Sequence, residues 1–326
     1  MIQLEKISKS YGGNLIFESI DLKIEQGETH VLMGDNGAGK TTLARILAGL
    51  EKPDSGSVIG LENQKDAHTM VIQQDFVIWP ELTVAQNMSV AADKKLTTHW
   101  LETTGLSHLT HSKAGILSHG QKQRLSIARA MASRPRLLII DEAFSYLDPV
   151  KSRDAIKWVS DALKSSTNPL KYILWITQSP QEAMTVADRL SIIEKGKPVI
   201  TGLAEDIYNN PPSYNIAQLT GEISQLNYTN WLTCKNSLTY HEQEIQLREN
   251  QILTFRPEWC SLSPCDLNSE TKGFQILASR FSPHGYISQI SYEGRTPINI
   301  HTPEKPDPSL PHHLHFHRVP PVFNIS

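Results

Sequence analysis

Short apolar runs alternate with helical patterns over the first 200 residues of the chain. The run ETHVLM at 28–33 reads as a buried strand, and TTLARILAGL at 41–50 reads as the helix that follows it. Further buried strands are predicted at TMVIQ, RLLIID, YILWIT and RLSIIE. Strands that alternate with helices in this way indicate an α/β domain.

Two changes of pattern divide the chain. Residues 84–117 carry a helical pattern without strands, which predicts a helical lobe inserted in the α/β domain. The segment YNNPPSYNIAQLTGE at 208–222 is rich in proline and asparagine and marks a boundary. Short alternating runs such as YISQISY and HLHFHRV follow it and predict a small β domain. We therefore expect two domains, at 1–222 and 223–326.

Composition excludes several classes of protein. The 31 lysines and arginines nearly balance the 34 aspartates and glutamates, so no basic excess favours nucleic acid as a partner. The three cysteines cannot all pair with one another, and no signal segment opens the chain, which together favour a reducing cytoplasm. No apolar run approaches the roughly 20 residues that span a bilayer. If a membrane is involved, a partner crosses it.

The segment GDNGAGKTT at 34–42 fits the phosphate-loop pattern G-x-x-x-x-G-K-[ST] between a predicted strand and a predicted helix. Backbone N–H groups of such a loop surround a phosphate. Lys40 would reach the β- and γ-oxygens of a nucleotide, and Thr41 would give a hydroxyl to Mg²⁺. The predicted nucleotide-binding residues here are Gly34, Asp35, Asn36, Gly37, Ala38, Gly39, Lys40, Thr41 and Thr42. A chance match in a glycine-rich turn is the alternative, and the flanking strand and helix argue against it.

Two acids end the apolar run RLLIIDEAF. Asp141 would hold Mg²⁺ through water, and Glu142 would act as the general base that polarises the attacking water. A solvated turn is the alternative for two acids at a strand end. Their occurrence together with a phosphate loop favours the catalytic interpretation.

These residues resemble the ATP-binding subunits of ABC transporters. LSHGQKQRLSIARAM at 117–131 resembles the family signature, SYLD at 145–148 its D-loop, and QDFVIWPELTV, which starts at Gln74, its Q-loop. Tyr11 in SKSYGG resembles the aromatic residue that stacks on adenine. The resemblance covers about residues 1–222 and implies ATP and Mg²⁺ as cofactors. It also implies that Gln74 contacts the metal and the water.

In this family two subunits hold two ATP molecules head to tail. The resemblance therefore implies that Ser118, Gly120, Gln121 and Asp148 of one copy face the nucleotide bound by Lys40 of a second copy. The free N–H groups and dipole at a helix N-terminus favour an anion in their own right. A serine N-cap on a core helix is the alternative, and it leaves the following Gly-Gln pair unexplained.

The segment ILWITQSPQEAM matches the family's switch region, but Gln178 stands where the family has a histidine. Glutamine donates a hydrogen bond through its amide, yet it is neutral and cannot carry a proton. We therefore expect ATP binding with slow hydrolysis. The alternative is that the amide substitutes geometrically and the rate is ordinary.

LTFRPEWCSL at 253–262 resembles a strand of the OB-like barrel domain attached to importer ATPases for iron, sulfate, polyamines and sugars. The implied protein is a translocase ATPase of an uptake transporter, with ferric iron or another small solute as cargo. Its implied partners are a second copy of itself, membrane permease subunits and, indirectly, a substrate-binding protein. Such a subunit lies peripherally on the cytoplasmic face of the membrane.

Two other functions stay open. One is a soluble ABC-type ATPase of translation or DNA repair, although those proteins generally carry two cassettes or a long coiled-coil insertion. The other is a regulatory nucleotide-binding subunit with little turnover. His313, His315 and His317 could share one face of a strand and hold a metal, but a solvated strand face is the favoured interpretation.

Overall fold

The protein is described by a computed structural model that covers residues 1–61, 68–73, 77–144, 149–165, 168–227, 238–239, 247, 251–264, 274–282, 285–292, 297–302, 305–306, 312–316, 320 and 322–324. The chain folds as two compact units, Met1–Glu205 and Asp206–Ser326. The sequence pattern instead places the domain boundary after Glu222. The segment between these two positions holds two short helices, and its contacts group it with the second unit.

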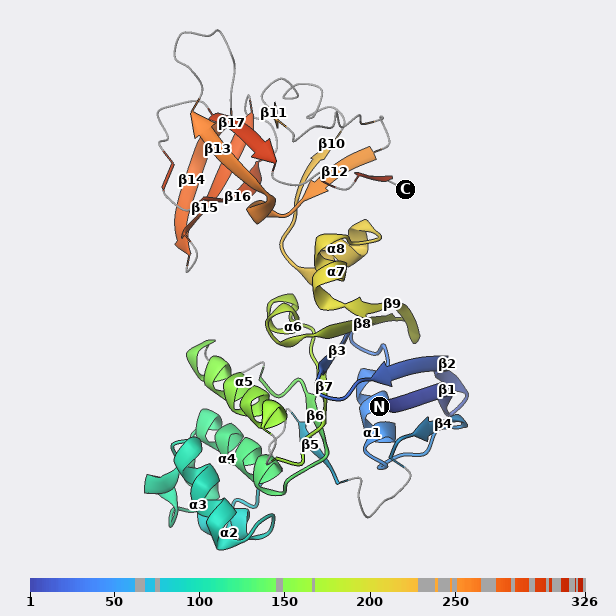
Figure 1. The fold of residues 1–326 in the computed structure, drawn as a ribbon, viewed down its shortest axis with the longest axis vertical. Helices are drawn as coiled ribbons and strands as arrows, with labels where there is room; N and C mark the ends of the chain where they lie inside the picture. The colour runs from blue at the N-terminus through green and yellow to red at the C-terminus, as the bar shows by residue number, and fades with distance from the viewer. Residues whose placement is uncertain are drawn as a thin grey trace. The chain divides into compact units, whose positions relative to one another are not determined.

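The first unit contains two sheets and six helices among its described residues (Figure 1). Its strands are β1 (Ile2–Tyr11), β2 (Asn14–Ile24), β3 (Thr29–Gly34), β4 (Ser55–Ile59), β5 (Thr69–Gln73), β6 (Leu137–Asp141), β7 (Tyr172–Ile176), β8 (Arg189–Glu194) and β9 (Lys197–Leu203). Its helices are α1 (Lys40–Leu47), α2 (Val84–Ser89), α3 (Lys94–Thr103), α4 (His119–Ala132), α5 (Pro149–Lys164) and α6 (Pro180–Val186). The five buried runs predicted as strands of this unit form strands, and the run at 41–50 forms most of α1.

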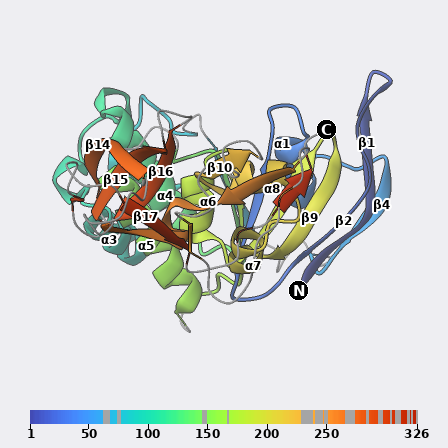
Figure 2. The same ribbon diagram turned by 90° about the horizontal axis from the view of Figure 1, so that it is seen from above.

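The central sheet has the order β5-β6-β7-β3-β8-β9, and only the β8–β9 pair is antiparallel. Every residue of β3, β6 and β7 is buried, because helices and a second sheet cover the two faces. The second sheet, β2-β1-β4, is antiparallel and packs with α1 over a core that includes Leu4, Leu43 and Leu174. Figures 1 and 2 show α2–α5 on the opposite side from that sheet.

The predicted helical lobe is present. Helices α2 and α3 and two 3-10 turns, Ser107–Leu109 and Ala114–Ile116, fill the range from Val84 to Ile116. Helix α2 is preceded by its N-cap Thr83, which forms a capping box with Gln86. Among the described residues, no helix has the length and apolar character needed to span a bilayer.

The described part of the second unit is mainly β, which confirms the predicted small β domain. Helices α7 (Ala204–Asn209, which starts at the end of the first unit) and α8 (Tyr214–Thr220) lead into it. Its strands are β10 (Ser224–Asn227), β11 (Leu238–Thr239), β12 (Gln251–Phe255), β13 (Cys260–Pro264), β14 (Phe274–Ser282), β15 (Gly285–Tyr292), β16 (Ile298–Thr302), β17 (His312–Phe316) and β18 (Val322–Asn324). They form a three-stranded sheet, β10-β12-β18, and a six-stranded sheet around β17 and β14.

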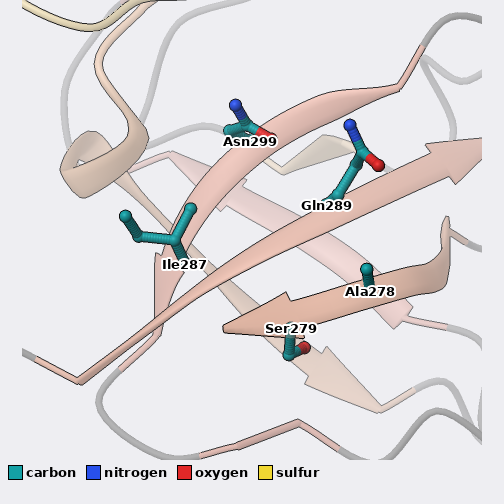
Figure 3. A pocket seen from close by; sticks show the side chains of 5 residues that line it. All are labelled: Ala278, Ser279, Ile287, Gln289 and Asn299. Carbon is teal, nitrogen blue, oxygen red and sulfur yellow. The ribbon is translucent and has the colours of Figure 1, made fainter. Parts of the chain in front are cut away.

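Apolar side chains from both sheets form the core of the second unit, including Leu253, Ile290 and Phe316. A pocket of about 290 Å³ lies on β14, β15 and β16. Figure 3 shows its lining side chains, with Gln289 and Asn299 on neighbouring strands pointing the same way. The Asn299 amide also donates a hydrogen bond to Glu222 at 2.9 Å.

Candidate active site

The carboxyl ends of β3, β6 and β7 meet at one edge of the central sheet. Asp141, the last residue of β6, pairs with Ile176 at the end of β7. Leu32 near the end of β3 pairs with the same Ile176. Parallel strands therefore deliver the phosphate loop after β3, the two acids at the end of β6 and the switch segment after β7 to one place.

The phosphate loop runs from Gly34 to Gly39, and α1 starts at Lys40. Gly39 is the N-cap of α1 and has φ 94°, a left-handed conformation that suits glycine. A Cβ on Gly34 would lie 2.1 Å from the carbonyl oxygen of Ile193, so only glycine lets the loop pass β8. The loop thus reaches the start of α1, where unpaired N–H groups and the helix dipole favour a phosphate.

Lys40 is buried, and its ammonium is held by its own loop. Its Nζ donates to the carbonyl oxygens of Gly34 at 2.7 Å and Asp35 at 3.0 Å. Glu142 Oε1 lies 4.0 Å from the same nitrogen. Burial lowers the pKa of Lys40, and the nearby carboxylates, Glu142 foremost, oppose that shift. The charge is therefore placed in a low-dielectric site where a phosphate would be a strong partner.

The two acids occupy different environments. Asp141 is buried, which raises the pKa of its carboxyl, and a hydrogen bond with the Thr41 side chain partly offsets this. Glu142 has φ 51°, a left-handed conformation that is uncommon for a residue other than glycine. Its backbone N–H donates to Ile176 O at 3.0 Å, which holds this turn against the end of β7. Such conformations cluster at functional sites.

Gln178 connects the switch segment with both other parts of the site. Its amide nitrogen donates to Glu142 Oε1 at 2.6 Å and to Asn36 Oδ1 at 2.7 Å. Asn36 belongs to the phosphate loop, and both Gln178 and Asn36 are exposed. One neutral amide therefore ties the phosphate loop to the predicted general base at the surface where a nucleotide would enter.

The oxygen donors at this edge fit a magnesium ion. Mg²⁺ is commonly held by one or two carboxylates together with substrate phosphates. Thr41 and Asp141, already joined by a hydrogen bond, are the residues that would hold it, and a cation would offset the cost of burying Asp141. Among the described residues, no group of three or more acidic, histidine or cysteine side chains gathers to hold a metal. His317 lies outside those residues.

Tyr11, the predicted adenine-stacking residue, ends β1 and is 44% exposed. Its hydroxyl donates to Glu51 Oε1, and its side chain also forms a hydrogen bond with Thr42 of the phosphate loop. Lys9 lies 5.3 Å from the centre of the ring. The structure thus brings Tyr11 beside the phosphate loop, with a large part of its side chain open to solvent.

Ser118, the predicted signature residue, is the N-cap of α4. Gln121 N donates to Ser118 Oγ at 3.4 Å, and Ser118 N donates to Gln121 Oε1 at 2.8 Å. This is a capping box, so helix capping accounts for Gln121 as well as for Ser118 within one chain. The spacing S-x-x-Q signals that motif in the sequence. Gly120, between them, is half-buried.

Two predicted site residues cannot be placed, because Gln74 and Asp148 lie outside the described residues. One residue that sequence reasoning missed is Glu182, on α6 behind the switch segment. Its carboxylate accepts hydrogen bonds from Trp175 at 2.8 Å and Thr177 at 2.6 Å. The sequence gives no signal of these hydrogen bonds around Glu182. Both donors lie in β7 or in the residue after it, and only the fold brings them to α6.

Comparison with known proteins identifies the family of the chain. A family model described as ABC transporter matches residues 17–145. A spermidine/putrescine import ATP-binding protein of Pasteurella multocida is 33% identical over 70% of this chain and 65% of its own length. The chain therefore spans less than two thirds of that relative. A protein of the same description from Spiroplasma citri is 30% identical over 90% of this chain and 86% of its own.

Two further matches extend the comparison. A sulfate/thiosulfate import ATP-binding protein of Synechococcus elongatus is 29% identical over 77% of this chain and 76% of its own length. A solved structure described as the ATP binding subunit of an ABC transporter superposes with a TM-score of 0.59, at 23% identity, over 68% of this chain and all of that one. The superposition shows the same fold. The chain therefore belongs to the importer branch of the ABC transporter ATP-binding subunits.

Proposed function

We propose that this chain binds and hydrolyses ATP to drive an ABC uptake transporter. The observation that carries the proposal is the position of the Glu142 carboxylate. It is held by Gln178 at 2.6 Å and lies 4.0 Å from the Lys40 ammonium, beside a loop shaped for phosphate. A base beside a phosphate-neutralising cation is what in-line transfer of a phosphoryl group to water requires.

In the proposed reaction a water oxygen attacks the γ-phosphorus, and the bond from that phosphorus to the β,γ-bridging oxygen breaks. Glu142 accepts the proton of the water, and ADP and phosphate leave. The Lys40 ammonium gives up its hydrogen bonds to the loop carbonyl oxygens, binds the phosphate oxygens instead and neutralises the charge of the phosphate. Bound Mg²⁺ would supply further charge neutralisation between Thr41 and Asp141. Gln178 holds Glu142 in place and, being neutral, leaves the turnover slow.

Two variants test this chemistry. Lys40→Ala removes the phosphate-binding cation, so ATP binding weakens and turnover is lost. Glu142→Gln removes only the base, so ATP stays bound while hydrolysis slows by about 10²-fold or more. Both are measured as phosphate release and nucleotide affinity, with Glu102→Gln on the exposed side of α3 as a matched control. Normal hydrolysis by Glu142→Gln would show that the base is another residue.

The proposed assembly is a homodimer of this chain on the cytoplasmic face of a membrane, bound to permease subunits. An exposed apolar surface on the helical lobe and the segment before it supports a membrane partner. We use the term lobe surface for the exposed large apolar side chains of residues 77–116, namely Val77, Trp79, Val90 and Ile116, which are 40–78% exposed. Monomeric proteins rarely leave several large apolar side chains exposed in one region unless a partner covers them.

The lobe surface offers a matched pair of variants. Ile116→Glu should abolish co-purification with a multi-span permease from membranes, because Ile116 is 78% exposed and a charge there would be buried in the contact. Val199→Glu on β9, at a position 49% exposed, should leave co-purification intact. Recovery of the wild-type chain with ribosomes or DNA instead of a permease would contradict the transport proposal.

The proposal for the cargo is based on the descriptions of the relatives, because the nucleotide site does not contact the cargo. Their descriptions name spermidine and putrescine or sulfate and thiosulfate. We propose a small solute of this kind, with ferric iron as the further candidate from the resemblance of the second unit. Ligand identified in the co-purified substrate-binding protein decides among them.

A further inference from the structure

Glu182 lies next to the hydrolysis site but not in it. It is half-buried on α6, four residues beyond Gln178, and it is the one acid of the first turn of that helix. Burial raises the pKa of its carboxyl, while the hydrogen bonds from Thr177 and Trp175 oppose the shift. A carboxylate removed from water in this way is costly unless its oxygens are bound. Both of its oxygens are bound.

The first oxygen holds the switch segment. Thr177 Oγ1 donates to Glu182 Oε2 at 2.6 Å and accepts from Ser179 N at 3.0 Å. Glu182 N in turn donates to Ser179 Oγ at 3.2 Å. The residues on both sides of Gln178 are thus fixed to Glu182, which leaves the backbone of Gln178 little freedom.

The second oxygen holds the turn at the general base. Trp175 Nε1 donates to Glu182 Oε1 at 2.8 Å. The Trp175 ring stacks on Phe144, with ring centres 4.8 Å apart and planes inclined by 24°. Both rings are almost completely buried, and Phe144 lies two residues beyond Glu142. The orientation of Trp175 therefore constrains the chain that carries the base.

We infer that Glu182 is a positioning residue for ATP hydrolysis, which sets Gln178 through Thr177 and supports the turn of Glu142 through Trp175 and Phe144. This inference rests on the proposed function. A carboxylate suits this position because it can accept both from the indole N–H, which can only donate, and from the Thr177 hydroxyl, whose oxygen already accepts from Ser179 N. A glutamine in its place would turn an NH₂ group toward one of them.

The first test is Glu182→Gln in the full-length chain. We expect its kcat for ATP hydrolysis to fall about tenfold while its affinity for ATP stays within about twofold, because misplacement of groups near the reacting atoms affects turnover and not nucleotide binding. Glu102→Gln makes the same chemical change at an exposed position of α3 and should behave like the wild-type protein. A kcat of Glu182→Gln equal to that of the control would overturn the inference and leave the proposed function standing. Absence of hydrolysis by the wild-type protein would overturn both.

The second test separates positioning from simple destabilisation. Thr177→Ser keeps the hydroxyl and should keep most of the kcat, whereas the nearly isosteric Thr177→Val removes it and should lose a clear part of the kcat, although less than Glu182→Gln, which also disturbs the bond from Trp175. Combined with Gln178→Ala, Glu182→Gln should cost less further activity than it costs alone, because one of its two routes passes through Gln178. Equal loss in the two Thr177 variants, or fully additive losses in the double variant, would contradict the inference.

Discussion

At the scale of single residues, the site depends on one amide. Gln178 uses one nitrogen to reach both Asn36 and Glu142. A neutral imidazole carries one N–H and could donate to only one of these acceptors, but it could also take up a proton as the reaction proceeds. At position 178, glutamine therefore has the advantage of two hydrogen bonds, whereas histidine has the advantage of a change of charge.

We expect Gln178→His to raise turnover several-fold at saturating ATP with the membrane partner present, because a residue that carries a proton replaces a neutral one. Phosphate release over a range of pH measures the rate, and a histidine-like step near pH about 6.5 should appear only in the variant. An unchanged or lower rate would mean that the double hydrogen bond of the amide is itself what positions Glu142.

A second residue-scale prediction concerns His30 on β3. It is fully buried, with Nε2 2.8 Å from Ser191 Oγ, and burial lowers the pKa of its imidazole to about 4. The unfolded chain, with an ordinary pKa near 6.5, therefore binds a proton that the folded chain refuses between these two values. The free energy of unfolding keeps its full value above the pKa of the unfolded chain. It decreases as the pH falls from there through the lower pKa of His30 in the folded chain.

The expected loss on acidification from pH about 7 to about 4 is of the order of 3 kcal/mol from this group. Urea unfolding of the wild-type chain and of His30→Gln, at several pH values, measures it. The variant keeps a hydrogen-bonding group toward Ser191 but cannot titrate. Parallel pH profiles for the two proteins would show that His30 does not cause the acid sensitivity.

At the scale of elements, α4 carries the feature whose proposed function depends on a second copy. Its N-terminus is exposed at Ser118, and its capping box leaves the N–H of Gly120 on the first turn outside the capping hydrogen bonds. A helix of this length has a dipole that favours an anion at that end. The single chain uses Ser118 to stabilise its own helix, and the proposed dimer uses the same turn to bind the nucleotide of its partner.

Ser118→Arg should prevent closure of the dimer and remove hydrolysis, because a bulky cation replaces the small cap, while ATP binding to the single subunit is largely kept. Lys40→Ala should be inactive for a different reason, because it lacks the cation that binds the phosphate. Mixing the two inactive proteins should restore one composite site, with Lys40 from one copy and Ser118 from the other, up to about half of the sites in a mixed dimer. If the mixture releases no more phosphate than the two separate variants, each site lies within one chain.

At the scale of the whole molecule, a buried arginine helps to join the segment at 206–222 to the β domain. Arg256 of the RPE segment is 1% exposed. Its guanidinium donates to the carbonyl oxygens of Ala217 at 2.8 Å and Glu222 at 3.3 Å, and to Thr220 Oγ1 at 2.7 Å. It also lies 4.2 Å from the ring centre of Tyr208. These contacts hold α7 and α8 to the β domain.

Arg256→Lys should destabilise the second unit by about 3 kcal/mol, because an ammonium cannot reproduce the planar fork and would leave buried carbonyl groups unsatisfied. Limited proteolysis of the full chain should show faster cleavage between residues 206 and 222, with the ATPase activity of the first unit kept. Arg153→Lys makes the same exchange at an exposed position of α5 and is the control. Equal cleavage of the two variants would show that Arg256 does not hold this segment.

The sequence by itself determined the elements and the chemistry that depends on adjacent residues. The alternation of apolar runs predicts the strands of the central sheet, since a buried parallel strand must be apolar throughout. The phosphate loop and the acids Asp141 and Glu142 are legible for the same reason, because each acts within a few consecutive residues. The S-x-x-Q capping box was equally legible, although capping was considered for Ser118 alone and not for Gln121.

The tertiary structure alone decided which of these residues meet. Asn36 and Gln178 are 142 positions apart, yet one hydrogen bond joins them, because parallel pairing of β3 with β7 brings their carboxyl ends together. The same pairing places Glu182 behind the switch segment and brings Trp175 onto Phe144. Arg256 reads as a charged surface residue until the fold surrounds it with carbonyl groups. Such contacts depend on strand order and helix packing, which no local pattern of side chains encodes.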